Sequence, residues 1–82
     1  MIKTDVRIVR VKDALQWGKE LLSKGSLEDP GLEARVIMEG LTGISRTSLL
    51  LDLRQEIAPN LLARYQALIE RRAKHEPVAY LL

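Results

Sequence analysis

Residues 29–43 read DPGLEARVIMEGLTG, and this segment determines how the rest of the chain can pack. Its first two residues predict a helix start, because aspartate can accept an orphan backbone N–H and proline has no N–H to leave unpaired. Gly43 predicts the helix end. At about 100° per residue, the apolar positions cover roughly two thirds of the circumference and leave Arg35 and Glu39 as a polar strip. We therefore expect a central helix that other helices surround. Its apolar positions are Leu32, Ala34, Val36, Ile37, Met38, Gly40 and Leu41.

Two further helical patterns and one short one flank this segment. Residues 11–24 repeat apolar side chains at the i, i+3, i+4, i+7 spacing of an amphipathic helix, and Gly25 is expected to cap it in the left-handed conformation. Ser45 predicts the cap of a short leucine-rich helix. Pro59 opens a last long helix, and Pro77 prevents that helix from continuing to the end of the chain.

These patterns predict an all-α fold, a small bundle of four to five short helices over residues 11–76. Residues 1–10 are β-branched and weakly patterned, so an N-terminal arm, an edge strand and a leading helical turn all stay open for them. Residues 77–82 form an apolar tail with no later element to pack against. We interpret this tail as the start of a connector to a further part of a longer protein.

The composition excludes several classes of protein. The chain has 82 residues, 46% hydrophobic and 29% charged, which suits one small folded domain and is not typical of disorder. It has no Cys and one His, so neither a disulfide framework nor a structural zinc site is expected. Its apolar runs fall far short of the ~20 residues that cross a bilayer. We expect a soluble, cytoplasmic protein without membrane contact.

Two charged side chains break the apolar pattern. Glu33 projects into the apolar arc of the central helix, and Arg72 projects onto the apolar stripe of the last helix. A buried ion loses its hydration, so each of the two needs a partner. We expect a semi-buried carboxylate–guanidinium pair, between Glu33 and Arg72 or between Glu33 and Arg46, that fixes how two helices dock. A catalytic or ligand-binding role is the less favoured alternative.

No pattern in the chain predicts a catalytic, cofactor-binding or metal-binding residue. The glycines lack the strand-to-helix context of a phosphate loop, the hydroxyl side chains lack a histidine partner, and His75 is expected to cap a helix or lie at the surface. Arg64, Arg71 and Lys74 form a basic strip that is a candidate partner surface, although a solvated helix end is the simpler interpretation. The strip does not favour nucleic acid, because no aromatic side chains are interleaved with it.

Three segments resemble the N-terminal domain of the release-factor glutamine methyltransferases, the HemK/PrmC family. They are residues 32–38, 43–47 and 69–82, and the resemblance as a whole covers residues 11–82. Its most specific part is the double arginine, followed by Glu-Pro and then by an apolar-Ala-Tyr run. His75 departs from the family, which usually has glycine before Glu-Pro.

The resemblance implies a longer parent enzyme, in which the helical bundle precedes a Rossmann-like methyltransferase domain that uses S-adenosylmethionine. The implied substrate is a peptide-chain release factor, methylated on the side-chain nitrogen of the glutamine in its Gly-Gly-Gln motif. The family's catalytic Asn-Pro-Pro-Tyr motif and cofactor-binding glycines would lie beyond residue 82, so none is assigned here. Residues 77–82 would begin a β-hairpin connector to the catalytic domain, and the bundle would help to hold the release factor.

Two other functions stay open from the residues alone. A free-standing helical adaptor would offer a groove to a partner helix. A basic helical nucleic-acid binder, which the charge pattern supports less well, would lose affinity steeply as salt rises.

Overall fold

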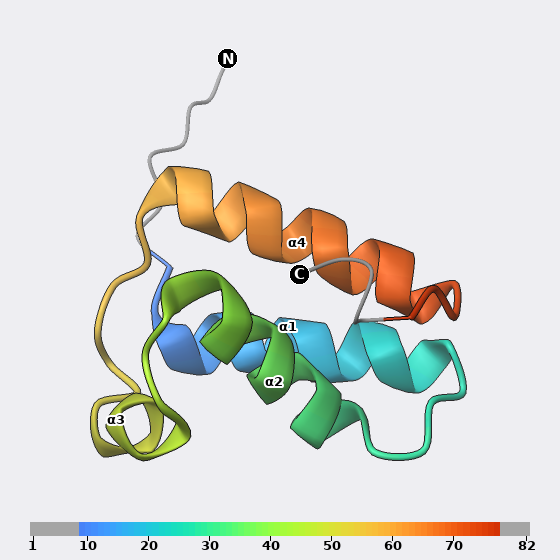
Figure 1. Cartoon of the computed structure of the whole chain (residues 1–82), viewed down its shortest axis with the longest axis horizontal. Helices are drawn as coiled ribbons and strands as arrows, with labels where there is room; N and C mark the ends of the chain where they lie inside the picture. Colours follow the sequence, from blue (N-terminus) through green and yellow to red (C-terminus); the bar gives the residue numbers. More distant parts are fainter. Residues whose placement is uncertain (1–8, 78–82) are drawn as a thin grey trace.

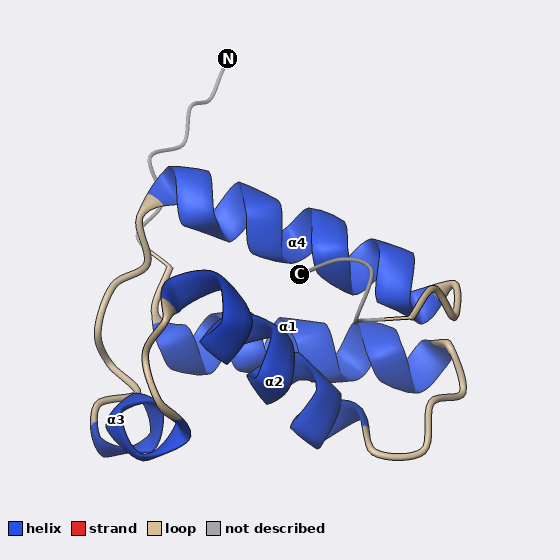
Figure 2. Cartoon of the chain, viewed as in Figure 1, coloured by secondary structure: helices blue, strands red, loops and turns tan. Residues whose placement is uncertain are grey.

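The computed structural model describes residues 9–77, which form four helices (Figure 1). They are α1 (Val11–Lys24), α2 (Pro30–Thr42), α3 (Arg46–Leu51) and α4 (Pro59–Ala73). Over the same residues the structure has no strand (Figure 2). One isolated antiparallel bridge joins Arg10 and Glu56. The predicted all-α bundle of four to five short helices is confirmed.

The helix starts follow the local chemistry that the sequence predicts. Asp29 Oδ1 accepts a hydrogen bond from the backbone N–H of Leu32 at 3.3 Å, and Pro30 takes the first helical position of α2. Ser45 Oγ accepts from the backbone N–H of Ser48 at 3.2 Å and caps α3 in the same way. The end of α2 is also confirmed, because Gly43 has a φ of 73°, a left-handed conformation that favours glycine.

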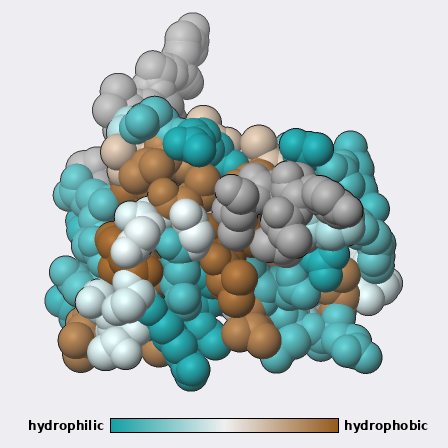
Figure 3. Space-filling view, viewed as in Figure 1, coloured by the Kyte–Doolittle hydropathy of each residue, from teal (hydrophilic) through white to brown (hydrophobic). Residues whose placement is uncertain are grey.

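The core lies where α1, α2 and α4 pack on one another, with α3 against α2. Complete burial of an aliphatic side chain contributes roughly 1.5–3 kcal/mol, so these side chains supply most of the driving force for folding. On the face shown in Figure 3, hydrophobic residues also reach the surface between hydrophilic ones. The buried apolar residues of the described chain are Val11, Ala14, Leu22, Ala34, Ile37, Met38, Leu49, Tyr65, Leu68 and Ile69.

Tyr65 holds α4 against α1. Its side chain is fully buried, and its hydroxyl donates a hydrogen bond to the carbonyl oxygen of Ala14 at 2.9 Å. Gly18 makes room for that hydroxyl, since a Cβ at this position would overlap the tyrosine oxygen. The ring of Trp17 lies beside the phenol, with ring centroids 6.3 Å apart and planes tilted by 54°. A glycine in the middle of α1 therefore allows the close approach of the two helices.

Gly25 follows the end of α1 as predicted, but the predicted left-handed conformation is wrong. Its φ is −82°, so it is not left-handed, and Ser26 takes the positive φ of 64° instead. Glycine is needed here for another reason: a Cβ on Gly25 would lie 2.5 Å from the carbonyl oxygen of Ala73 at the end of α4. The end of α1 thus touches the backbone of α4, a contact that local sequence pattern cannot reveal.

The prediction that other helices surround α2 is wrong in part. The helix does contact α1, α3 and α4, but Leu32 and Val36 remain 44% and 41% exposed. Conversely, the predicted polar strip is half-buried, with the side chains of Arg35 and Glu39 only 21% and 31% exposed. The apolar arc is wider than the neighbouring helices can cover, and the long arginine side chain can pack its stem against them while its head stays polar.

The two described residues that precede α1 run beside the segment before α4. The backbone N–H of Ile57 donates to the carbonyl oxygen of Val9 at 2.9 Å, and Arg10 Nη1 donates to the carbonyl oxygen of Arg54 at 2.8 Å. The rest of the predicted arm, residues 1–8, and of the predicted connector, residues 78–82, lies outside the described residues. Within residues 9–77, no helix is long and apolar enough to cross a bilayer.

Candidate functional site

Glu33 and Arg72 form a two-pronged ion pair between the first turn of α2 and the last turn of α4. Arg72 Nε donates to Glu33 Oε1 at 2.9 Å, and Nη2 donates to Oε2 at 3.0 Å. The Arg72 side chain is 21% exposed and the Glu33 side chain is 26% exposed. The sequence left Arg46 open as an alternative partner, but the structure joins Glu33 to Arg72 and places Arg46 in the exposed first turn of α3.

The position of each charge suits its helix as well as its partner. A carboxylate is favourable at a helix N-terminus and a guanidinium at a C-terminus, so Glu33 and Arg72 also complement the dipoles of α2 and α4. The hydrogen bonds that Arg72 donates to the Glu33 carboxylate raise the pKa of Arg72 above its usual value, against the opposing effect of burial. Arg72 Nη1 additionally donates to the carbonyl oxygen of Glu76 at 3.1 Å. One guanidinium thus holds the start of α2 and the backbone that leaves α4.

His75 ends α4 in a conformation that normally favours glycine. Its φ is 71°, and its backbone N–H donates to the carbonyl oxygen of Arg72 at 2.8 Å. Its ring lies across the end of α1, with Nε2 2.6 Å from the carbonyl oxygen of Gly25. Because a carbonyl oxygen only accepts, Nε2 carries the hydrogen in this contact. The side chain therefore makes a tertiary hydrogen bond that a glycine here would lack.

The basic strip predicted on α4 is only partly available to a partner. Arg71 Nε donates to Glu76 Oε1 at 3.0 Å, and Nη2 lies 2.8 Å from the same oxygen. Arg64 and Lys74 are exposed. A partner-binding role for Arg64, Arg71 and Lys74 stays a prediction.

A hollow of about 290 Å³ between α1, α2 and the end of α3 escaped sequence reasoning. The helical spacing of residues 11–24 puts Lys12 and Lys19 on the polar side of α1, and Arg35 lies on the predicted polar strip of α2, but neither pattern brings the three residues together. The i, i+4, i+7 spacing of Lys12, Gln16 and Lys19 was a weak signal, since such residues share one side of a helix. We call this site the α1–α2–α3 hollow. Its lining residues are Lys12, Leu15, Gln16, Lys19, Gly31, Arg35, Leu50 and Leu53.

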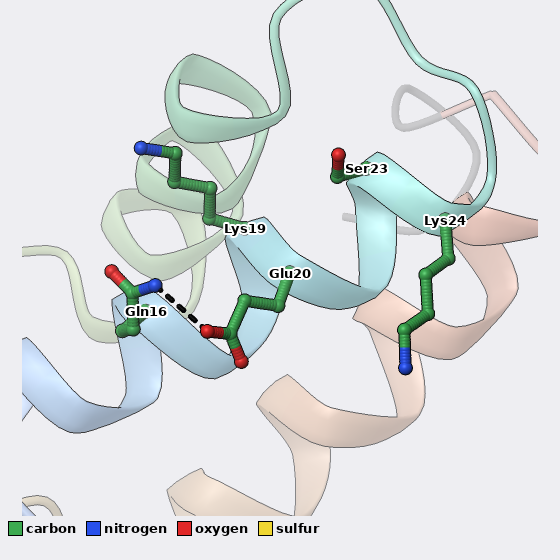
Figure 4. A pocket seen from close by; sticks show the side chains of 5 residues that line it. All are labelled: Gln16, Lys19, Glu20, Ser23 and Lys24. Atoms are coloured by element: carbon green, nitrogen blue, oxygen red, sulfur yellow. Dashed lines mark hydrogen bonds between the residues drawn. The ribbon is translucent and has the colours of Figure 1, made fainter.

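A second, polar hollow of about 360 Å³ follows the outer side of α1 (Figure 4). Two of its lining residues are bonded to each other: Gln16 Nε2 donates to a carboxylate oxygen of Glu20 at 2.9 Å. Lys19 lines both hollows, and Figure 4 shows its side chain directed from α1 toward α2. The negative charge of Glu20 stands between the positive charges of Lys19 and Lys24, so this second hollow carries both signs.

Two features that commonly hold a cofactor or a metal are absent from residues 9–77. Each glycine with a close neighbour serves helix packing: Gly18 faces Tyr65 and Gly25 faces Ala73. Gly43 ends a helix without a preceding strand, so the strand-to-helix cradle for a dinucleotide or S-adenosylmethionine is not formed by residues 9–77. No group of three potential metal ligands occurs among these residues either.

Comparison with known proteins assigns the family. The family model described as PrmC N-terminal domain matches residues 13–82. A release factor glutamine methyltransferase of Deinococcus radiodurans is 33% identical over 73 residues, which are 89% of this chain and 26% of that protein. One from Moorella thermoacetica is 35% identical over 71 residues, 87% of this chain and 25% of that protein. A bifunctional methyltransferase of Rickettsia prowazekii is 32% identical over 72 residues, 88% of this chain and 14% of that protein.

The chain thus spans 26% or less of the length of these relatives. No solved structure matches it. The resemblance of residues 32–38, 43–47 and 69–82 is confirmed by the family model, which extends over the helical bundle and the apolar tail. The chain belongs to the PrmC N-terminal domain family.

Proposed function

We propose that this chain is the N-terminal domain of a release factor glutamine methyltransferase and that it helps to bind the release factor. The observation that carries the proposal is the family match over residues 13–82, together with relatives that bear this name. In the proposed reaction, a methyl group passes from S-adenosylmethionine to the side-chain nitrogen of the glutamine in a Gly-Gly-Gln motif. Because release factors act in translation, we also propose a cytoplasmic location.

The proposal divides recognition from chemistry. Contacts made far from the reacting glutamine can still lower the barrier, because they fix the substrate in place before the reaction. Such contacts require a rigid unit, and the buried Tyr65–Ala14 hydrogen bond and the Glu33–Arg72 pair hold α1, α2 and α4 to one another. We propose that the bundle acts as one rigid docking unit for the body of the release factor.

The cofactor belongs, in this proposal, to residues beyond this chain. In support of this, Gly18 and Gly25 make room for α4 and Gly43 ends α2, and no strand precedes a helix within residues 9–77. The relatives are four to seven times longer than the matched region, since that region covers 14–26% of them. We propose that a catalytic domain follows Leu82 and that the Arg72 contact with Glu76 sets the direction in which the chain leaves the bundle.

The test compares the full methyltransferase with a version that lacks residues 1–76. Two substrates are used: the intact release factor, and a short peptide that carries Gly-Gly-Gln and is too small to reach the bundle. We expect the deletion to raise KM for the release factor by about tenfold or more, which corresponds to ~1.4 kcal/mol of lost binding. We expect the peptide kinetics and the affinity for S-adenosylmethionine to stay unchanged.

The peptide is also the control for folding of the catalytic domain. If peptide methylation falls with the deletion, the exposed double variant Arg64→Glu with Lys74→Glu replaces it, since it leaves the bundle intact. Unchanged release-factor kinetics in the deletion variant would refute the proposed role.

A further inference from the structure

The α1–α2–α3 hollow has an apolar wall and a basic rim. Three leucines form the wall, and two lysines and one arginine stand around it. These residues are Leu15, Leu50, Leu53, Lys12, Lys19 and Arg35. With about 290 Å³ it lies at the lower end of ligand pockets, which run from about 300 to 1,000 Å³. A hollow of this size suits one inserted side chain of a partner better than a large cofactor.

The charged residues that line the hollow all have one sign. None of its lining residues in the described chain is an aspartate or a glutamate. Lys12 and Lys19 lie two helical turns apart on α1, so both face the same side. The stem of Lys19 crosses the first turn of α2, where a Cβ on Gly31 would lie 3.9 Å from the lysine Cδ. Positive side chains from two helices therefore converge over the leucine wall.

Arg35 contributes a positive charge that the bundle does not fully pair. Its Nε is buried and has no hydrogen-bond partner among residues 9–77. The carboxylate of Glu39 is 3.9 Å from this nitrogen, which is beyond hydrogen-bond distance. That nitrogen is closed to solvent, so it does not itself meet a ligand; what Arg35 adds to the rim is the positive charge of a side chain that is 21% exposed.

The apolar wall continues onto the surface of α3. Leu50 lines the hollow and is 45% exposed, and the next residue, Leu51, is 82% exposed. Exposed large apolar side chains beside a pocket are typical of a protein-binding surface. The apolar and the basic parts lie next to each other, so one ligand can contact both.

We propose that the α1–α2–α3 hollow binds an acidic segment of a protein partner, which inserts one aliphatic side chain between the leucines and sets its carboxylates against the basic rim. Charge complementarity selects this occupant, because every charged lining residue is positive. Nucleic acid fits less well, since the lining has no aromatic side chain on which a base could stack. The identity of the partner rests on the proposed function: if that function holds, the acidic segment belongs to the release factor.

The first test titrates the isotopically labelled 82-residue chain with the peptide Ac-Glu-Asp-Leu-Glu-NH2 and follows amide chemical shifts. We expect saturable shifts at Leu15, Leu50 and Leu53 that weaken as salt rises. Two control peptides, Ac-Lys-Lys-Leu-Lys-NH2 and Ac-Glu-Asp-Ser-Glu-NH2, should bind at least about fivefold more weakly. The first lacks the carboxylates, and the second lacks the aliphatic side chain. Equal binding of the lysine peptide, or shifts elsewhere on the bundle, would overturn the proposal.

Matched variants separate the hollow from net charge. Lys19→Glu and Lys24→Glu make the same charge change at exposed positions of α1, but only Lys19 lines this hollow. We expect Lys19→Glu to raise the peptide Kd by about tenfold and Lys24→Glu by about twofold or less. Leu50→Ser, on the exposed wall, should weaken binding without unfolding the bundle. An equal loss in Lys19→Glu and Lys24→Glu would contradict the site.

A second arm uses the unmethylated release factor and the oligonucleotide dT10 as probes. If the release factor binds the wild-type chain and binds the Lys19→Glu chain as tightly, the hollow is not its site, while the proposed function stands. If the acidic peptide binds at the hollow and the release factor binds nowhere, the hollow stands and the proposed function fails. Tighter binding of dT10 than of the acidic peptide would overturn the protein-partner assignment.

Discussion

The hydroxyl of Tyr65 donates a hydrogen bond to the carbonyl oxygen of Ala14 at 2.9 Å, inside the interface between α4 and α1. The space for it comes from Gly18, one turn further along α1. A tyrosine buried in an otherwise aliphatic core needs such a partner, because an unpaired hydroxyl costs about 1–3 kcal/mol. This contact fixes both the distance and the register of the two longest helices.

Gly18→Ala should destabilise the bundle although alanine is the better helix former. The propensity gain is about 1 kcal/mol, but the new Cβ overlaps the Tyr65 oxygen, and overpacking typically costs about 1–3 kcal/mol. In a Tyr65→Phe background the overlapping atom is gone, so Gly18→Ala should cost at least about 1 kcal/mol less. Urea unfolding of the four proteins measures this coupling, and strictly additive free energies would contradict the contact.

Tyr65 should also make the stability depend on alkaline pH. Burial raises the pKa of Tyr65 above its usual 10.0, because the charged phenolate is poorly solvated in the core. Above pH 10 the unfolded chain loses the phenol proton while the folded chain keeps it, so the free energy of unfolding falls by up to about 1.4 kcal/mol per pH unit. Below that pH both states are protonated and the effect vanishes.

The measurement compares wild type with Tyr65→Phe by urea unfolding from pH 8 to pH 11. The difference between the two free energies of unfolding should be constant below pH 10. Above pH 10 the wild type should lose stability relative to Tyr65→Phe. A difference that stays flat over the whole range would show that the phenol titrates alike in both states.

The Glu33–Arg72 pair should contribute more than an exposed pair does. A double-mutant cycle with Glu33→Gln and Arg72→Met should give a coupling free energy of about 1 kcal/mol. This value is at the upper end of the range for exposed ion pairs and is smaller than the coupling of fully buried pairs. The pair of Arg71 and Glu76, with side chains 57% and 41% exposed, is the internal control and should couple by less than about 0.5 kcal/mol. Equal couplings for the two pairs would mean that half-burial adds nothing.

His75 should respond to substitution in a way that separates its backbone from its ring. His75→Ala loses the hydrogen bond to Gly25 and keeps the φ of 71°, so it should cost about 1 kcal/mol. His75→Gly loses the same bond but removes the left-handed strain, so it should be more stable than His75→Ala by about 0.5–1 kcal/mol. If the two variants unfold at the same urea concentration, the conformation at this position is not strained.

The features that the sequence predicted correctly depend on neighbours a few residues away. The caps at Asp29, Ser45 and Gly43 are of this kind, since side chain and accepting backbone lie within one turn. Gly25 was assigned the wrong reason because its close neighbour, Ala73, is far along the chain. The need for Gly18 was invisible for the same reason.

In the candidate site, too, local pattern predicted some features, and the placement of the helices decided the others. The inward charge of Glu33 and of Arg72 was visible as a break in helical periodicity, but choosing between Arg72 and Arg46 required the relative placement of α2, α3 and α4. A helical projection places Arg35 on a polar strip and says nothing of its burial, because it treats one helix in isolation. Its actual environment depends on how α1 and α3 border α2.

The central claim is that this bundle binds a release factor by itself. Isothermal titration calorimetry of the 82-residue chain with the unmethylated release factor tests it without any catalytic domain present. We predict saturable one-to-one binding that weakens with added salt and with Lys19→Glu. A folded chain that gives no binding heat at several temperatures, and that leaves methylation by the full enzyme uninhibited when added in excess, would contradict the claim.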